Sequence, residues 1–190
     1  MSNDRLQLAV LLGSDREGRF GPTVANWFAD RARRRDDVEV DLVDIVDLDL
    51  PQRHPGGPNE AVRRHDERIS RADAFVVVTP EYNHSFPGGL KHAIDVVHGG
   101  WARKPVGFVS YGGISGGLRA VEHLRPVFAE LHATTIRETV SFAMAHGAFE
   151  DGEPIDRAGT DLAAAVLLDD LVWWADALRT ARRRDERKAA

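Results

Sequence analysis

The sequence predicts an α/β protein in which helices cover both faces of a doubly wound sheet of five parallel strands. Short apolar runs rich in β-branched residues alternate with segments whose apolar residues recur at helical spacing. Such alternation is typical of a parallel sheet with crossover helices. The 190 residues show no internal repeat and no linker, so we expect a single domain over residues 1–190.

The first half of the chain is expected to supply three strands and two helices. Apolar runs predict strands at 6–12 and 75–78, and alternating apolar and polar residues predict another at 38–43. Pro22 suits the first turn of a helix that ends in a basic cluster. An irregular connection rich in Asp, Pro and Gly precedes a second helix of weak periodicity, expected at 61–72.

The second half is expected to alternate helices with two further strands. A helical pattern resumes at Leu90, and an apolar run predicts a strand at 106–110. Alternating apolar residues, interrupted by Glu138, predict a strand at 136–142 near a sheet edge. Pro126 lies inside the helical pattern between these strands, where a proline can kink a helix. The chain closes with a long helical pattern and then a charged segment, about 180–190, which we expect to be helical or disordered.

A flavodoxin-like strand order, 2-1-3-4-5, suits five strands joined by right-handed crossovers. In such a sheet the ligand lies at the carboxyl ends of the strands, in the crevice between strands one and three. The loops at 13–21, 80–89 and 110–117 all leave the sheet at that edge, and each is rich in glycine or polar residues. We therefore expect the functional site to be built from these three loops.

The loop at 13–21 is expected to bind phosphate. It runs into a helix N-terminus, which favours anions, and it carries the hydroxyl of Ser14 and the guanidinium groups of Arg16 and Arg19. It is not a P-loop, because Arg19 and Phe20 stand where that motif needs Lys and a Mg²⁺-binding hydroxyl, and the chain has no G-x-G-x-x-G. A terminal monophosphate, such as that of FMN, remains the best candidate.

The other two loops are expected to hold a flat ring. Tyr82 offers an aromatic face, Asn83 can both donate and accept hydrogen bonds, and the glycines within 110–117 let the backbone approach closely. Backbone N–H groups aimed at the pyrimidine edge of a flavin would stabilise charge on its reduced form. Because the cofactor carries the hydride chemistry, we expect no catalytic acid or base.

The glycine-rich loop also matches G-x-S-x-G, the nucleophile elbow of α/β-hydrolases, with Ser115 as the nucleophile. The elbow needs a tight turn at the serine, but four residues separate Ser115 from the predicted strand end. No Asp lies between Ser115 and His146, the last histidine, so Glu138 would have to serve as the acid. A serine hydrolase using Ser115 is therefore a remote alternative.

Composition excludes several other classes. The net charge of −5 provides no basic field for nucleic acid, and the absence of cysteine excludes disulfides, thiolate metal sites and a Cys nucleophile. The eight histidines lack metal-binding spacing, so we expect no metal. No apolar run approaches the roughly 18 residues of a membrane span, and the N-terminus predicts a strand and no signal peptide. We expect a cytoplasmic protein.

These residues resemble the NAD(P)H-dependent FMN reductases of flavodoxin-like fold, which include quinone, azo-dye and chromate reductases. The resemblance rests on the segments 13–21, 80–95 with its P-E-Y-N and S-x-P-G-x-L-K motifs, and 104–125 with S-Y-G-G, and it spans nearly residues 6–142. It implies FMN as cofactor, NADPH or NADH as co-substrate, and a homodimer or dimer of dimers with FMN near the subunit interface.

The resemblance also implies a set of FMN contacts. The phosphate would face Ser14, Arg16 and Arg19, and the isoalloxazine ring would be bordered by Pro80, Glu81, Tyr82 and Asn83 on one side and by Ser110, Gly112 and Gly113 on the other. Family members often have Ser-Phe-Asn at positions 19–21 of this chain, and Asn where His92 stands. We predict an oxidoreductase that passes electrons from NAD(P)H through FMN to quinone-like or other small acceptors; the alternative is a flavodoxin-like electron carrier without its own NAD(P)H turnover.

Overall fold

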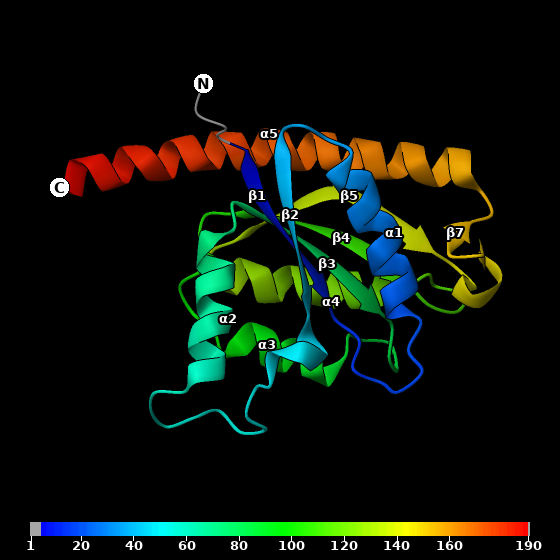
Figure 1. The fold of residues 1–190 in the computed structure, drawn as a ribbon, viewed down its shortest axis with the longest axis horizontal. Helices are drawn as coiled ribbons and strands as arrows, with labels where there is room; N and C mark the ends of the chain where they lie inside the picture. The colour runs from blue at the N-terminus through cyan, green and yellow to red at the C-terminus, as the bar shows by residue number, and fades with distance from the viewer. Residues whose placement is uncertain (1–4, 190) are drawn as a thin grey trace.

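A computed structural model describes residues 5–189, and it contains the predicted sheet of five parallel strands (Figure 1). Their order is β2-β1-β3-β4-β5, which confirms the flavodoxin-like prediction and places the last strand at an edge. The strands are β1 (Leu6–Leu12), β2 (Val38–Asp44), β3 (Ala74–Pro80), β4 (Pro105–Tyr111) and β5 (Thr134–Phe142). Both β3 and β4 are buried along their whole length, as expected for central strands covered on two faces.

Within residues 5–189, five α-helices form the two outer layers. One layer packs the alternate strand residues of the core against α1 (Gly21–Arg33) and α5 (Arg157–Ala189). The other packs the remaining strand residues against α2 (Glu60–Arg71), α3 (Gly88–Asp95) and α4 (Leu118–Glu130). The apolar stripes read from the sequence therefore face the sheet, and Figure 1 shows α5 running across its whole width.

Short elements lie in the segment that we expected to be irregular and in the segment that follows β5. A 3₁₀ turn, η1 (Ile45–Leu48), follows β2, and another, η2 (Ala145–Gly147), follows β5. A two-stranded antiparallel ribbon, β6 (Phe149–Glu150) and β7 (Glu153–Pro154), then leads into α5. Such brief elements leave almost no periodic signal in a sequence.

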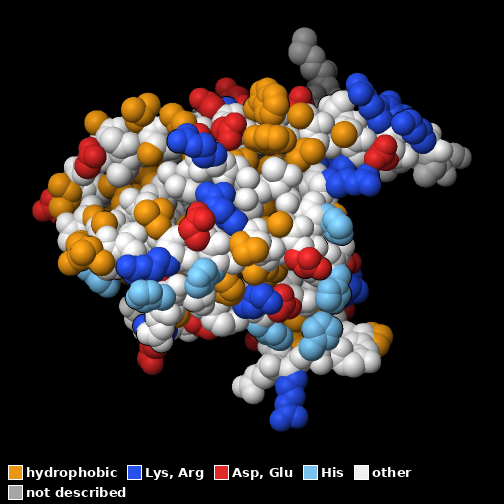
Figure 2. All heavy atoms as spheres, turned by 180° about the vertical axis from the view of Figure 1, so that it is seen from behind, with side chains coloured by type: hydrophobic (Ala, Val, Ile, Leu, Met, Phe, Trp, Pro, Cys, Tyr) orange, Lys and Arg blue, Asp and Glu red, His pale blue; other side chains and the backbone are white. Residues whose placement is uncertain are grey.

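The charged C-terminal segment continues α5 as helix to Ala189, which is the first of the two states expected for it; Ala190 lies outside the described residues. Exposed basic side chains gather at this end of the helix (Figure 2). Among residues 5–189, no helix combines the length and apolarity needed to cross a membrane.

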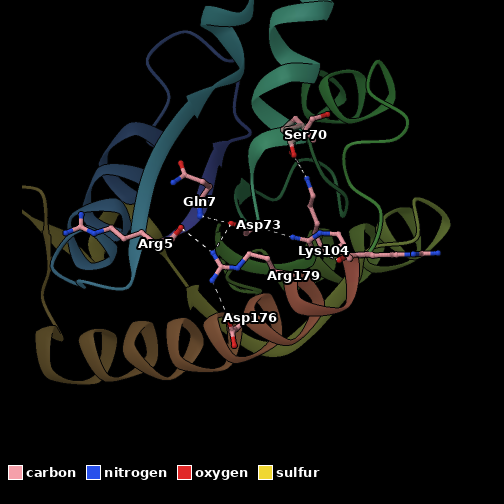
Figure 3. A network of polar contacts seen from close by, with 10 residues as sticks. Arg5, Gln7, Ser70, Asp73, Lys104, Asp176 and Arg179 are labelled. Atoms are coloured by element: carbon pink, nitrogen blue, oxygen red, sulfur yellow. Dashed lines mark hydrogen bonds and ion pairs between the residues drawn. The ribbon is translucent and has the colours of Figure 1, made fainter. Parts of the chain in front are cut away.

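Polar contacts anchor α5 at the amino ends of the strands (Figure 3). Asp73, just before β3, accepts hydrogen bonds from the Gln7 backbone at 3.1 Å and from Arg182 of α5 at 2.9 Å. Nearby, the buried Lys104 ammonium donates to the carbonyl oxygens of Ile69 and Ser70 at 2.9 and 2.8 Å, closing the C-terminus of α2. These contacts fix the end of α5 and the C-terminus of α2 at the amino edge of the sheet.

Candidate functional site

A cavity of about 470 Å³ lies at the carboxyl ends of the strands, where the fold predicts a ligand. Its volume is in the range of small-molecule and cofactor sites. Seven of the ten predicted contact residues line it: Arg16, Arg19, Pro80, Glu81, Tyr82, Gly112 and Gly113. The structure thus brings the three predicted loops together around one space.

Ser14 lies beneath the first loop and is fully buried. Its Oγ has no hydrogen-bond partner within the described chain, which is unusual for a buried hydroxyl. Nearby, α1 begins after Phe20 without any side-chain cap. Pro22 has no N–H and the Thr23 N–H donates to the Phe20 carbonyl oxygen at 3.1 Å, so it is the Gly21 N–H and the positive end of the helix dipole that favour an anion there. An orphaned hydroxyl beside an uncapped helix start is the arrangement that a bound phosphate would complete.

Arg19 is held differently from what we expected. Its guanidinium donates two hydrogen bonds to the Asp44 carboxylate, at 2.8 and 2.5 Å, and a third to the Ser14 carbonyl oxygen at 2.5 Å. The bonds to Asp44 raise the pKa of Arg19. The side chain therefore ties the loop to the end of β2, and its predicted contact with phosphate has to compete with this ion pair.

Arg16 has no carboxylate partner in the described part of the chain. Its guanidinium carbon lies 3.7 Å from the centre of the Tyr82 ring, a cation–π stack that borders the cavity. Arg16 is thus the loop's available cation, and Tyr82 already presents its ring to a planar charged group.

Asn83 lies outside the cavity and is exposed. It forms a tight turn with His84, both with positive φ (50° and 68°), between Tyr82 and Ser85, which exchange backbone hydrogen bonds at 2.8 and 3.0 Å. Asn is among the residues that adopt this conformation most readily. In this structure Asn83 shapes the turn that presents Tyr82.

Glu81 joins the second loop to the third. Its carboxylate accepts hydrogen bonds from Ser115 Oγ at 2.6 Å and from the Arg119 guanidinium at 2.8 Å. Burial acts to raise the pKa of Glu81, but the bonds from Ser115 and Arg119 outweigh it and lower that pKa. Ser115 donates to this carboxylate and is not shown bonded to a histidine base, so the geometry gives the serine-hydrolase alternative no support.

Ser110 is also outside the cavity, fully buried below the third loop. Its Oγ donates to the Gly116 carbonyl oxygen at 2.8 Å. Gly117 has φ +84°, and a Cβ there would lie 2.8 Å from the backbone nitrogen of Tyr111. Ser110 and Gly117 therefore fix the path of the loop whose Gly112 and Gly113 reach the cavity.

A fourth wall was missed by sequence reasoning. It consists of Met144–Gly147, which follow β5, and it is joined to the third loop by hydrogen bonds from Met144 N to Gly113 O (2.9 Å) and from Ala145 N to Gly112 O (3.0 Å). His146 packs against Phe20, with ring centroids 4.9 Å apart. Because β5 is parallel to its neighbour, its following loop had to emerge at the same edge, and that signal was available.

His92 and the other histidines show no sign of a metal site. His92 Nε2 lies 2.7 Å from the Pro51 carbonyl oxygen and holds the connection after η1 against α3. Several histidines lie along the lower part of the face in Figure 2, and the rings of His54 and His98 are 5.8 Å apart. Within residues 5–189, no group of three or more His, Asp or Glu side chains is placed to hold a metal ion.

Comparison with known proteins identifies a family of flavin-dependent reductases. The family model described as NADPH-dependent FMN reductase matches residues 6–147, which is most of the chain. A curated NAD(P)H-dependent FMN reductase of Schizosaccharomyces pombe is 36% identical over 120 residues, covering 58% of this chain and 60% of that protein. A quinone reductase of Escherichia coli is 37% identical over 150 residues, covering 72% of this chain and 76% of that protein.

A solved structure supports the fold. The flavoenzyme NAD(P)H:(acceptor) oxidoreductase from Paracoccus denitrificans matches with a TM-score of 0.73 at 24% identity, covering 90% of this chain and 98% of that chain. The match to the Schizosaccharomyces pombe relative spans less than two thirds of that protein's length.

Proposed function

The chain belongs to the NADPH-dependent FMN reductase family, and on this premise we propose that it is an FMN-dependent oxidoreductase that passes electrons from NADPH or NADH to quinone-like or other small acceptors. The observation that carries the proposal is the cavity at the carboxyl edge of the sheet, where aromatic and glycine-rich walls meet an uncapped helix start. Such a site suits a planar ring with a single phosphate.

The residues fit FMN at both of its ends. The buried, unpartnered Ser14 Oγ, the start of α1 and the unpaired guanidinium of Arg16 would hold the phosphate. Pro80 and Tyr82 would border the ring on one side and Gly112 and Gly113 on the other, as their place in the cavity wall suggests.

Bound FMN supplies the hydride and electron chemistry. The residues of the chain bind the cofactor, orient it and shelter it. Glu81 holds the second and third loops together through Ser115 and Arg119, so both walls of the cavity are fixed relative to each other. Phe20 and Tyr111, whose ring centroids lie 6.2 Å apart, add apolar surface to the cavity wall.

A homodimer or dimer of dimers, and a cytoplasmic location, remain proposals that rest on the sequence resemblance. Exposed apolar side chains near the site, among them Ile114 at 87% exposure and Met144 at 67%, are compatible with contact to a second copy. Light scattering on the purified protein measures the oligomeric state directly.

The spectrum and turnover of the purified protein test the function. We expect the purified protein to bind FMN, so that it absorbs at about 450 nm. We also expect it to oxidise NADPH or NADH when a quinone is present. A protein that binds no flavin would contradict the proposal. A yellow protein that oxidises neither nicotinamide would instead support the electron carrier.

A further inference from the structure

Three groups converge at the start of α1, beside the cavity. A Cβ added at Gly21 would lie 2.2 Å from Ser14 Oγ and 2.7 Å from the Tyr111 hydroxyl oxygen. Because residue 21 is glycine, the hydroxyl groups of Ser14 and Tyr111 can lie close together at the N-terminus of α1. Tyr111 comes from the end of β4 and also lines the cavity, so its hydroxyl joins this spot to the site.

Both hydroxyl groups are able to donate a hydrogen bond. Ser14 Oγ has no partner that meets hydrogen-bond geometry in the described chain, although the Tyr111 hydroxyl lies close enough for the two groups to interact. Burial raises the pKa of Tyr111 to about 12, with the nearby Ser14 hydroxyl opposing that rise, so the phenol stays protonated at neutral pH. Burial has already removed both donors from water. An anion that accepts from both would therefore give them hydrogen bonds that they lack in the free protein.

The loop's second arginine does not compete for that position. Arg19 directs two hydrogen bonds to Asp44 and one to the Ser14 carbonyl oxygen, and this last bond fixes the backbone that carries the Ser14 hydroxyl. The guanidinium of Arg19 therefore fixes the Ser14 backbone and does not itself contact the anion. The neutral hydroxyl groups of Ser14 and Tyr111 are the side-chain donors at the start of α1.

We infer that the Tyr111 hydroxyl, together with Ser14 Oγ, donates hydrogen bonds to the phosphate of the bound flavin nucleotide, while Arg19 positions Ser14. This inference rests on the proposed function and adds a binding residue to it. It makes Tyr111 a determinant of selectivity, because a flavin without phosphate gains nothing from this hydroxyl.

Dissociation constants for FMN and riboflavin, measured by quenching of flavin fluorescence, test the inference. Tyr111→Phe is expected to weaken FMN binding about tenfold, as the loss of a hydrogen bond to a charged group does, and to leave riboflavin binding within about twofold. The chain has two tyrosines, and both line the cavity. Tyr82→Phe is therefore the matched control, and it should leave the ratio of the two constants unchanged.

An equal loss for both flavins in Tyr111→Phe, or no loss for FMN, would overturn the inference. So would a wild-type protein that binds riboflavin as tightly as FMN, although the proposed function would then still stand. A wild-type protein that binds neither flavin overturns both.

Ser14→Ala provides the test if Tyr111→Phe does not fold. It removes a hydroxyl whose oxygen meets no hydrogen-bond geometry in the described chain and whose nearby hydroxyl is that of Tyr111, so the fold should survive it. A loss of FMN affinity that riboflavin does not share supports the inference, and an unchanged ratio overturns it.

Discussion

Arg19 and Asp44, which are 25 residues apart, form a two-pronged ion pair whose side chains are only 17% and 19% exposed. Asp44 also accepts from the Val46 backbone and so caps η1. One carboxylate at the end of β2 therefore holds both the loop at 13–21 and the start of η1.

Asp44→Ala is expected to lower the free energy of unfolding by about 2 kcal/mol, because it leaves Arg19 unpaired and removes the cap of η1. Urea unfolding followed by circular dichroism measures this. Asp30→Ala is the control, since its pair with Arg33 is about half exposed and should contribute less than about 0.5 kcal/mol. Equal effects of the two substitutions would contradict the role given to Asp44.

Acid should weaken the contact between the second and third loops. The pKa of Glu81 lies below its ordinary value of 4.5, because hydrogen bonds from Ser115 and Arg119 outweigh the effect of burial. The stability contributed by this group is therefore present above about pH 4.5 and is lost as the pH falls through the lower, folded pKa.

Glu81→Gln tests that pH dependence. It is expected to cost about 1 kcal/mol at pH 7 and progressively less as the pH falls from about 4.5 through the lower pKa of the folded protein, because the wild-type carboxylate then loses its charge. Urea unfolding of both proteins across the acid range measures the difference. A cost that stays constant with pH would show that the carboxylate charge is not what joins the loops.

Lys104 should make stability rise at alkaline pH. Burial, reinforced by Arg182, lowers its pKa from 10.5 to about 8 in the folded protein. Between those values the unfolded chain holds a proton that the folded chain has released, so stability increases with pH. The raised pKa of Tyr111 acts in the opposite sense only above about pH 10, where an unfolded tyrosine ionises.

Lys104→Met should abolish that rise between about pH 8 and about pH 10, and it should also destabilise the protein by leaving the Ile69 and Ser70 carbonyl oxygens unpaired. Lys91→Met is the control, because Lys91 is partly exposed in a pair with Asp95 and should leave the slope unchanged. The measurement is the urea midpoint as a function of pH.

Two glycines of the third loop should respond to alanine very differently. At Gly117 the positive φ and the 2.8 Å approach of a Cβ to the Tyr111 nitrogen predict a loss of about 3 kcal/mol. At Gly113 a Cβ would meet no atom within 4 Å, so stability should change by less than about 0.5 kcal/mol. Thermal unfolding of both variants decides whether backbone conformation or mere glycine content shapes the loop.

The strands and their order could be predicted from the sequence because their signals are local or follow general rules. The run at 75–78 is β-branched and apolar along its length, and right-handed crossovers restrict the order of five parallel strands. The same rules placed Arg16 and Tyr82 at one edge of the sheet, where the structure stacks them.

The parts that could not be predicted depend on contacts between distant side chains. Nothing near Arg19 in the sequence indicates that Asp44 will bind it. The burial of Ser110 and the outward turn of Asn83 depend on how neighbouring residues pack and turn, and not on which residue types are present. The position of Met144–Gly147 could have been predicted from the parallel direction of β5, but their 3₁₀ turn is too short to produce a periodic pattern that would mark the segment as structured.

The anchoring of α5 near Asp73 has a practical consequence. Arg182 bonds to Asp73 and to the Arg103 carbonyl oxygen, so the last turns of the helix lie at the amino edge of the sheet, opposite the cavity. A surface tether or fluorescent dye coupled through Lys188 would leave the mouth of the cavity unobstructed. The protein can therefore be immobilised on an electrode with its cofactor side facing the solution.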